Sequence, residues 1–197
     1  MKQNSNYENC IVLLMGFAGV GKLTTAKELV KHPNFKLADN HTWINPVFSL
    51  IQQDGLTPIP KAAWKKVGKI FDIVFETMQE LSPSNFSFVL TGELIEGDEY
   101  PKIFYQRICQ LAESRKSVFL PVRLECNEEA IVKRVKNIER RKHCKTIDAD
   151  RSARLTRDSE VFHTNHRNEI TIDNTDKSPE QVINIILKHL NKITVIT

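Results

Sequence analysis

Short apolar runs alternate along the chain with stretches whose apolar residues recur every three or four positions. The apolar runs predict buried strands at 10–17, 35–38, 86–90, 118–124 and 169–173. The helical spacing predicts helices at 22–30, 64–81, 104–111, 130–141 and 178–193. This alternation is typical of a parallel sheet with helices on both faces. The pattern therefore predicts an α/β fold, a three-layer α/β/α arrangement around a five-stranded parallel sheet.

No internal repeat, low-complexity tract or linker divides the chain, so we expect one domain over residues 1–197. In open parallel sheets, ligands bind beyond the carboxyl ends of the strands. That rule selects residues 16–24, 39–41 and 91–93 and the loop after Asp173. We expect these four segments to converge on one edge of the sheet.

The overall composition is that of an ordinary globular protein. Of the 197 residues, 41% are hydrophobic and 26% charged, and the formal net charge is +4. No apolar run approaches the roughly 20 residues that span a bilayer, so we expect no membrane partner. The four cysteines are widely spaced without a C-x-x-C pair, which indicates reduced thiols and a cytoplasmic location. A chain of this size can act as a monomer, which is what we expect.

One segment has the spacing of a phosphate-binding loop. It reads Gly16, Phe17, Ala18, Gly19, Val20, Gly21, Lys22, Leu23, Thr24. This is G-x-x-x-x-G-K between an apolar strand and a helix, the context that such a loop requires. Glycines let the backbone wrap with its N–H groups turned toward phosphate oxygens, and the helix N-terminus adds positive partial charge. Lys22 would bring a full positive charge to the outer phosphates, so the segment predicts an ATP site.

Leu23 departs from this pattern, because the position after the lysine usually holds a Ser or Thr that ligates Mg²⁺. A leucine side chain cannot coordinate a metal ion. The next residue, Thr24, can still contact phosphate, near the α-phosphate. We therefore expect Mg²⁺ to be held mostly by phosphate oxygens and water.

The run GFAGVGKLTTAKEL resembles the first strand, loop and helix of the P-loop kinases of nucleotides and small metabolites. Adenylate-kinase-like members also place a non-hydroxyl residue after the lysine and a threonine next. A basic segment after the fourth strand, and Ile172-Asp173-Asn174-Thr175 before the last helix, resemble shikimate kinase and related enzymes. GVGKLT combined with a later DNH is also similar to bacterial ATP-binding proteins of that superfamily. The Asp-Gly-x-Pro-Arg of adenylate kinases and the triple glycine of shikimate kinases are absent from the segment around Glu93.

Two acidic residues follow predicted strands. Asp39 ends the second strand, where the resemblance to shikimate-kinase-like enzymes implies a carboxylate that orients or deprotonates the acceptor hydroxyl. A turn or helix-cap role suits the Asp-Asn pair equally well. Glu93 ends the third strand, where many phosphate-loop proteins hold a Mg²⁺ water, and it is our candidate metal residue. His41 is a candidate substrate contact or a structural histidine.

Positive charge is concentrated in residues 133–157. They contain ten Lys or Arg and three Asp or Glu, or +7, which leaves −3 for the remainder of the chain. Mobile arginines can meet the charge that develops on a transferred phosphoryl group, so we expect a basic lid at about 140–166. Its candidate arginines are Arg140, Arg141, Arg151 and Arg154. The resemblance implies in addition that Arg134 stacks on adenine.

The same segment has two other interpretations. His163-x-x-His166 with His143 and Cys144 contains zinc-ligand residue types, but not the spacing of a known zinc module. A nucleic-acid-binding surface would use the positive charge, yet residues 133–157 contain no Phe, Tyr or Trp on which a base could stack. We expect neither zinc nor nucleic acid as a partner.

Together these features predict an ATP-dependent phosphotransferase that moves the γ-phosphoryl group to a small-molecule hydroxyl or phosphate. ATP and Mg²⁺ are the expected cofactors, and Lys22, Asp39, Arg140 and Arg141 the expected catalytic residues. Residues 44–60, which include three prolines, would form part of the acceptor pocket wall. The alternative is a regulatory ATPase or nucleotide switch with no small-molecule acceptor. The absence of an Asn-Lys-x-Asp motif argues against a GTP-dependent switch.

Overall fold

A five-stranded parallel sheet forms the centre of the molecule. The computed structural model describes residues 7–51, 54, 56–137, 139–140 and 144–194. The strands are β1 (Cys10–Met15), β2 (Phe35–Ala38), β3 (Ser87–Gly92), β4 (Val118–Glu125) and β5 (Ile170–Asp173). Their spatial order is β2-β3-β1-β4-β5, and every neighbouring pair is parallel. The predicted α/β fold with five parallel strands is confirmed.

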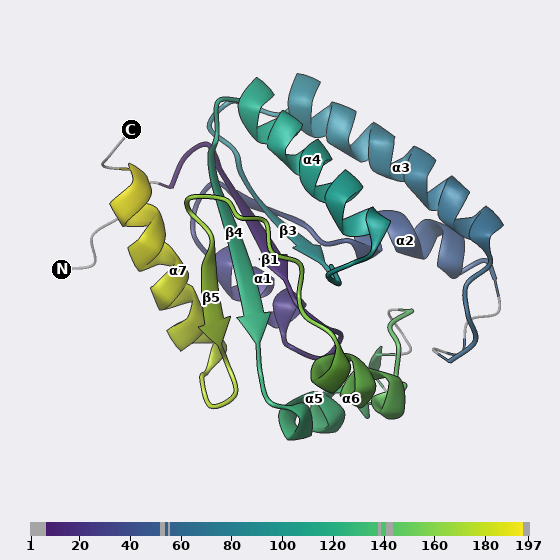
Figure 1. Ribbon diagram of the computed structural model, residues 1–197. Coiled ribbons are helices and arrows are strands. Elements are labelled where there is room, and N and C mark those ends of the chain that lie inside the picture. The colour runs from purple at the N-terminus through teal and green to yellow at the C-terminus, as the bar shows by residue number, and fades with distance from the viewer. Residues whose placement is uncertain (1–6, 52–53, 55, 138, 141–143, 195–197) are drawn as a thin grey trace.

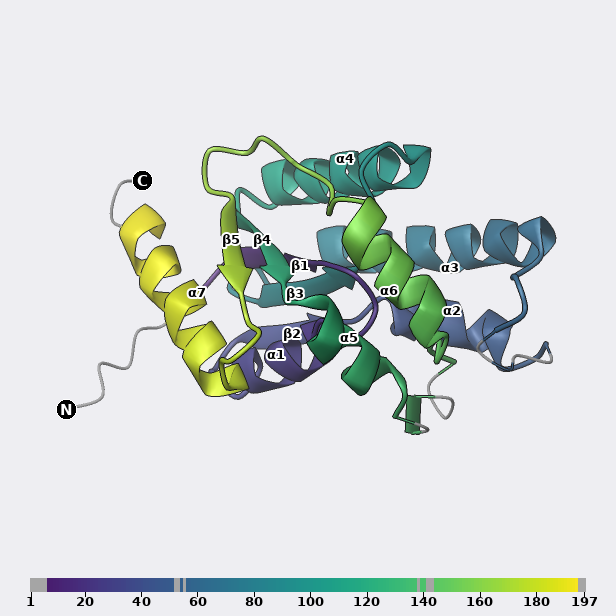
Figure 2. The ribbon, with the colours of Figure 1, turned by 60° about the horizontal axis from the view of Figure 1, so that its bottom comes forward.

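Helices cover both faces of this sheet. They are α1 (Lys22–Leu29), α2 (His41–Phe48), α3 (Lys61–Glu80), α4 (Glu99–Ser114), α5 (Glu128–Val135), α6 (Ala149–Asp158) and α7 (Pro179–Thr194). Helices α3 and α4 lie on one side of the sheet, and α1 and α7 on the other (Figure 2). Helices α5 and α6 lie beyond the ends toward which the arrowheads of β4 and β5 point (Figure 1). The three layers thus leave the carboxyl edge of the sheet facing α5 and α6.

Burial explains why the strands take these places. All six residues of β1 and all six of β3 are buried, as expected for central strands covered on both faces. Strands β2 and β5 are four residues long and partly exposed, which suits the two edges. The glycine-rich turn after the most deeply buried strand is therefore held at the middle of the sheet.

Two helices were not predicted. Helix α2 contains Pro46, a residue that normally interrupts a helix, and it lies in the range that we expected as pocket wall. Helix α6 lies inside the expected lid, and its only large apolar side chain is Leu155, so its sequence lacks a helical stripe. The fourth expected helix is shorter than predicted. It ends at Val135, so Arg140 lies in a separate short turn rather than at the helix end.

An aromatic cluster joins α2, α3 and α4 on one side of the sheet. The ring centroids of Trp43 and Phe71 are 5.5 Å apart, and those of Phe71 and Phe104 are 5.4 Å apart. Trp43 and Phe104 are almost completely buried. Such edge-to-face and tilted pairs add about 0.5–1.5 kcal/mol each beyond the area that they bury. The cluster fixes α2 against the two long helices.

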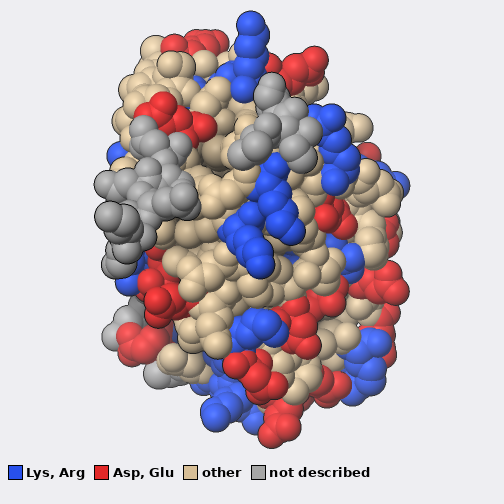
Figure 3. Space-filling view, turned by 90° about the vertical axis from the view of Figure 1, so that its left-hand side faces the viewer, with Lys and Arg blue, Asp and Glu red and all other residues tan. Residues whose placement is uncertain are grey.

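Within the described residues, no helix is both long and apolar enough to cross a membrane. On the side of the molecule that carries α7, Lys and Arg lie among Asp and Glu, and the described part of that face shows no continuous basic surface (Figure 3). Within the basic segment, Arg134, Arg151 and Arg157 contact other parts of the fold.

Candidate functional site

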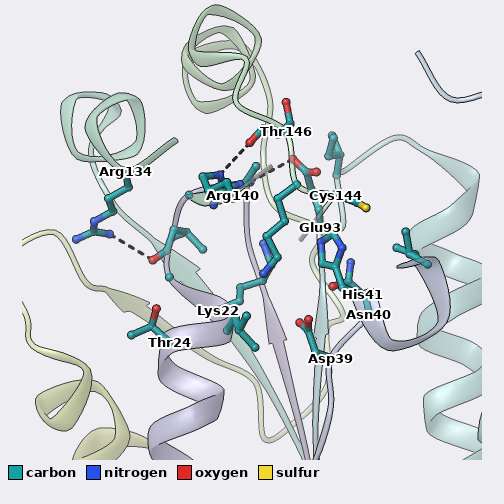
Figure 4. Close-up of a pocket in the computed structure, with 18 of the residues that line it drawn as sticks. Lys22, Thr24, Asp39, Asn40, His41, Glu93, Arg134, Arg140, Cys144 and Thr146 are labelled. Carbon is teal, nitrogen blue, oxygen red and sulfur yellow. Dashed lines mark hydrogen bonds between the residues drawn. The ribbon is translucent and has the colours of Figure 1, made fainter. Parts of the chain in front are cut away.

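The loops that follow β1, β2, β3 and β5 meet at one cavity of about 1700 Å³. Its wall includes residues of the segments 18–25, 39–41 and 174–175 and Glu93, together with side chains from α5, α6 and the turn before α6. Figure 4 shows Lys22, Asp39, His41, Glu93 and Arg140 arranged around this space. The segments after these four strands thus meet at one edge of the sheet, as expected.

The loop Gly16–Thr24, called the phosphate loop below, has the backbone of a tight wrap. Gly16, Gly19 and Gly21 have φ values of 152°, 90° and 105°, which residues with a side chain rarely adopt. A Cβ atom on Gly16 would lie 2.5 Å from the carbonyl oxygen of Leu124, and one on Gly19 would lie 2.6 Å from a methyl group of Val135. Glycine at these positions is therefore required both by conformation and by the close approach of β4 and α5.

Lys22 turns back over the loop that precedes it. Its Nζ donates to the carbonyl oxygens of Gly16 at 2.6 Å and Phe17 at 3.0 Å. Burial lowers the pKa of Lys22 to about 8, and the neighbouring Arg140 and Lys145 lower it too, while Glu93 opposes the shift. Burial and the neighbouring positive charges therefore make the protonated form of Lys22 less favourable at the phosphate loop.

Arg140 and Lys145 extend this positive field. The Arg140 guanidinium is held by its Nε, which donates to the carbonyl oxygen of Thr146 at 2.9 Å. Burial is the main cause of the lowered pKa of both Arg140 and Lys145, and repulsion from Arg140 adds to the shift at Lys145. Three cations from two segments of the chain therefore face one cavity, an arrangement that a polyphosphate would stabilise.

Asp39 is buried at the end of β2, with 8% of its surface exposed. Its Oδ1 accepts a hydrogen bond of 2.5 Å from the hydroxyl of Thr91 on β3. The backbone N–H of Asn40 donates to the same hydroxyl oxygen at 3.1 Å. His41 begins α2, and its Nδ1 lies 3.0 Å from Oδ1 of Asn45. The pKa of His41 is lowered, chiefly by burial and next by Lys145, which favours its neutral form.

Glu93 follows β3 and links the phosphate loop to α6. Its Oε1 accepts from the backbone N–H of Ala18 at 3.2 Å and lies 3.6 Å from an Nη of Arg151. The carboxylate is half-buried at the base of the cavity. Both contacts use Oε1, so the second oxygen, Oε2, could accept a hydrogen bond from a metal-bound water.

Arg134 and Asn174 brace the phosphate loop from the opposite side. The side-chain amide of Asn174 donates to the buried carbonyl oxygen of Val20 at 2.7 Å. Arg134 donates to the same carbonyl oxygen at 3.3 Å and to Oδ1 of Asn174 at 3.2 Å. Its other Nη donates to the carbonyl oxygens of Asn174 and Thr175. Arg134 thus lies at the cavity wall, where the resemblance placed it, and also holds three segments together.

Comparison with solved structures identifies the architecture. A gluconokinase from Sinorhizobium meliloti superposes with a TM-score of 0.60 at 11% identity, covering 95% of this chain and 94% of that one. A thymidylate kinase from Candida albicans gives 0.57 at 15% identity, with 95% and 93% covered. A shikimate kinase from Aquifex aeolicus gives 0.51 at 16% identity, with 94% and 98% covered. The chain has the fold of the P-loop kinases.

At these identities the likeness shows the fold, including the P-loop of residues 16–24, and leaves the substrate open. No protein-family model matches the chain, and no curated protein matches its sequence. The solved kinases that it resembles act on acceptors as different as a sugar acid and a nucleotide, by their names. The acceptor must therefore be inferred from this chain's own cavity.

The oxygen donors around the P-loop fit a magnesium ion held mainly by nucleotide. Asp39 and Glu93 offer carboxylates, Thr24 offers an exposed hydroxyl, and Leu23 offers nothing. Among the described residues, no group of three or more His, Cys, Asp or Glu could hold a metal ion by itself. Mg²⁺ suits such a site, because it retains several waters and takes one or two carboxylates together with phosphate oxygens.

The structure places the expected lid residues in different surroundings. Arg140 and Arg151 reach the cavity, whereas Arg154 is exposed on α6. Arg141 and His143 lie outside the described residues. His163 Nδ1 lies 2.8 Å from an Nη of Arg123, and the ring of His166 packs on that of Phe119 at 5.1 Å.

Sequence reasoning placed Thr91 at the site, within the segment 91–93, but gave it no role, and it did not select Lys145. Thr91 is next to Gly92 and Glu93 in the sequence, but its role depends on β2 and β3 being neighbours in register, with Ala38 beside Leu90. Lys145 was one of ten basic residues with no signal of its own. The count of charges located the segment, and only the folded chain shows which cation enters the cavity.

Proposed function

We propose that this protein is an ATP-dependent phosphotransferase that transfers the γ-phosphoryl group of ATP to a small-molecule acceptor. One observation carries the proposal: the Lys22 ammonium on the P-loop and the Asp39 carboxylate line the same cavity, with Arg140 and Lys145 above them. A carboxylate next to the transferred group is what an acceptor hydroxyl requires.

Each residue has a definable task in this reaction. Backbone N–H groups of residues 16–24 bind the phosphates, and Lys22 neutralises charge on the outer ones. The acceptor oxygen forms a bond to the γ-phosphorus, the bond from that phosphorus to the β–γ bridging oxygen breaks, and ADP leaves with the electron pair. Asp39 takes the hydroxyl proton. Arg140 stabilises negative charge that moves between the phosphate oxygens.

Mg²⁺, when bound with the nucleotide, would offset the negative charge of the phosphates. Asp39 and Glu93 are the residues that would hold its water ligands. Arg151 would take part in lid closure, because its approach to Glu93 already connects α6 to the P-loop. Closure of the expected lid, at about residues 140–166, would exclude water from the transferred group.

The test is a titration with ATP of the wild type and of the Lys22→Ala variant. Loss of a charge-assisted contact of about 1.5–3 kcal/mol predicts a roughly ten- to hundred-fold weaker affinity. Lys31→Ala is the matched control, because Lys31 is exposed beyond α1 and pairs with Glu28 at 2.6 Å. Equal ATP affinity in wild type and Lys22→Ala would overturn the nucleotide site. Slow hydrolysis that no small acceptor accelerates would instead favour the regulatory ATPase.

A further inference from the structure

The half of the cavity away from the P-loop is unlike the half that would bind phosphate. It is formed by α2, the segment 56–59, α3 and the start of α4, and we call it the acceptor end. Its wall includes the apolar side chains Trp43, Phe48, Ile59, Trp64, Phe71 and Phe104. Trp64 is 45% exposed although its ring packs on that of Phe48 at 5.1 Å. The indole of Trp64 is therefore partly accessible at a cavity that other aromatic side chains also line.

Few of the described side chains that line the acceptor end are charged. Among the described residues that line it, Arg107 is the one cation, and it lies 2.9 Å from Asp72. The same guanidinium lies over the Phe71 ring at 5.6 Å. Asp98 lines this end as well, so the formal charge of Arg107, Asp72 and Asp98 together is −1. By contrast, Lys22, Arg140 and Lys145 are all at the P-loop end.

This distribution discriminates between classes of acceptor. A phosphorylated or carboxylated acceptor needs arginines or lysines beside its anionic group, because an unpaired buried anion is costly. The acceptor end offers one arginine that is already paired, in a slightly negative field. An uncharged aromatic compound, in contrast, would gain roughly 25 cal/mol for each Å² of apolar surface that it buries there.

We propose that the acceptor is an uncharged hydroxyl compound with a planar, apolar body and without a phosphate or carboxylate group. The apolar body lies between Trp64 and Phe71, and the hydroxyl points to Asp39. This inference rests on the proposed phosphotransfer and names its substrate class. The transfer is the one given above, in which ATP supplies the phosphoryl group and Asp39 receives the hydroxyl proton. The product is a phosphate monoester.

The chain carries its own reporter for this binding. It contains two tryptophans, Trp43 and Trp64, and both line the acceptor end. Intrinsic tryptophan fluorescence therefore follows the occupancy of this end separately from that of the P-loop. Nucleotide binding is measured independently by calorimetry, so failure of one site is distinguishable from failure of the other.

The experiment compares three probes that share the reacting hydroxyl and differ in charge at the other end of the body, which would lie at the acceptor end. They are 6-phenylhexan-1-ol (the alcohol) and two anions, 4-(6-hydroxyhexyl)benzoate and 4-(6-hydroxyhexyl)phenyl phosphate, each titrated into the full-length protein with and without a non-hydrolysable ATP analogue. We expect the alcohol to change the tryptophan emission and to bind about ten-fold or more tightly than either anion. Binding of either anion as tight as that of the alcohol, or no response to the alcohol with nucleotide bound, would overturn the inference. Lack of ATP binding by the wild type would instead remove the proposed function.

Gly68 allows the acceptor end to be closed without removing a wall residue. It lines the cavity on α3, and a Cβ atom there would meet nothing within 4 Å. A Gly68→Phe variant should therefore fill the space, lower affinity for the alcohol about ten-fold or more, and leave ATP binding as the sign of a folded protein. Lys69→Phe is the matched control, since Lys69 is exposed on the next position of α3. Equal loss in both variants, or in neither, would count against the acceptor end as the binding place.

Discussion

The hydroxyl of Thr91 on β3 donates a 2.5 Å hydrogen bond to the Asp39 carboxylate at the end of β2. The same oxygen accepts from the backbone N–H of Asn40. The Thr91 hydroxyl that orients the carboxylate is therefore itself held by a second hydrogen bond. Two neighbouring strands of the sheet thus position the carboxylate that would receive the acceptor proton. Precise placement of this kind is what general base catalysis requires.

Asp39→Asn should reduce phosphoryl transfer by roughly 10²- to 10⁴-fold with ATP affinity preserved, because an amide cannot take the proton. The measurement is the rate of ADP formation with an active acceptor, beside calorimetry with ATP. Thr91→Val keeps the shape and removes the hydroxyl, and should lower kcat by about ten-fold or more through loss of a hydrogen bond to a charged group. Full activity of Asp39→Asn would show that Asp39 caps the turn and does no chemistry.

The lowered pKa of Lys22 predicts a pH dependence with a definite sign. Its pKa is about 8 in the folded protein against an ordinary value of 10.5. Between these values the unfolded chain binds more protons, so the stability contributed by this group rises with pH across that window. Lys22→Met should lack that rise. Because the pKa of Lys145 is also lowered, Lys145→Met identifies the part of the remaining slope that belongs to Lys145.

ATP should reverse the shift at Lys22, since phosphate charge favours the protonated ammonium. Binding near pH 9 should therefore take up a proton in the wild type and not in Lys22→Met. Calorimetry in two buffers of different ionisation enthalpy measures this uptake directly. Proton release, or the same uptake in Lys22→Met, would place the effect on another group.

Local and non-local features were predictable to different degrees. The P-loop was predicted because its residues are consecutive and lie between a buried strand and a helix. Asp39 and Thr91 are 52 positions apart, and their contact follows from the strand order, which periodicity does not contain. Helix α6 was missed for a related reason. An N-cap and contact with α5 hold this helix, rather than an apolar stripe: the backbone N–H of Arg151 donates to Oδ1 of Asp148.

Asn174 offers a prediction that combines stability and binding. Its side-chain amide satisfies the buried carbonyl of Val20 in the P-loop. Asn174→Ala leaves that group short of a partner and should lower the free energy of unfolding by about 1–3 kcal/mol, with weaker ATP binding. Chemical denaturation and ATP calorimetry measure the two effects. Asn184→Ala on the exposed face of α7 should change neither.

Two glycine-to-alanine variants with opposite expected signs test whether the P-loop backbone is built as described. At Gly16 the φ of 152° and the 2.5 Å approach to the Leu124 carbonyl oxygen exclude a Cβ atom, and the obstructing atom is backbone that cannot move aside. Gly16→Ala should therefore destabilise the fold by about 1–3 kcal/mol and abolish ATP binding. Gly68 lies within helix α3 with open space around it, so Gly68→Ala should stabilise the fold by about 0.5–1 kcal/mol. Thermal or urea unfolding gives both values, and a Gly16→Ala variant as stable as the wild type would mean that β1 and β4 do not approach as closely as described.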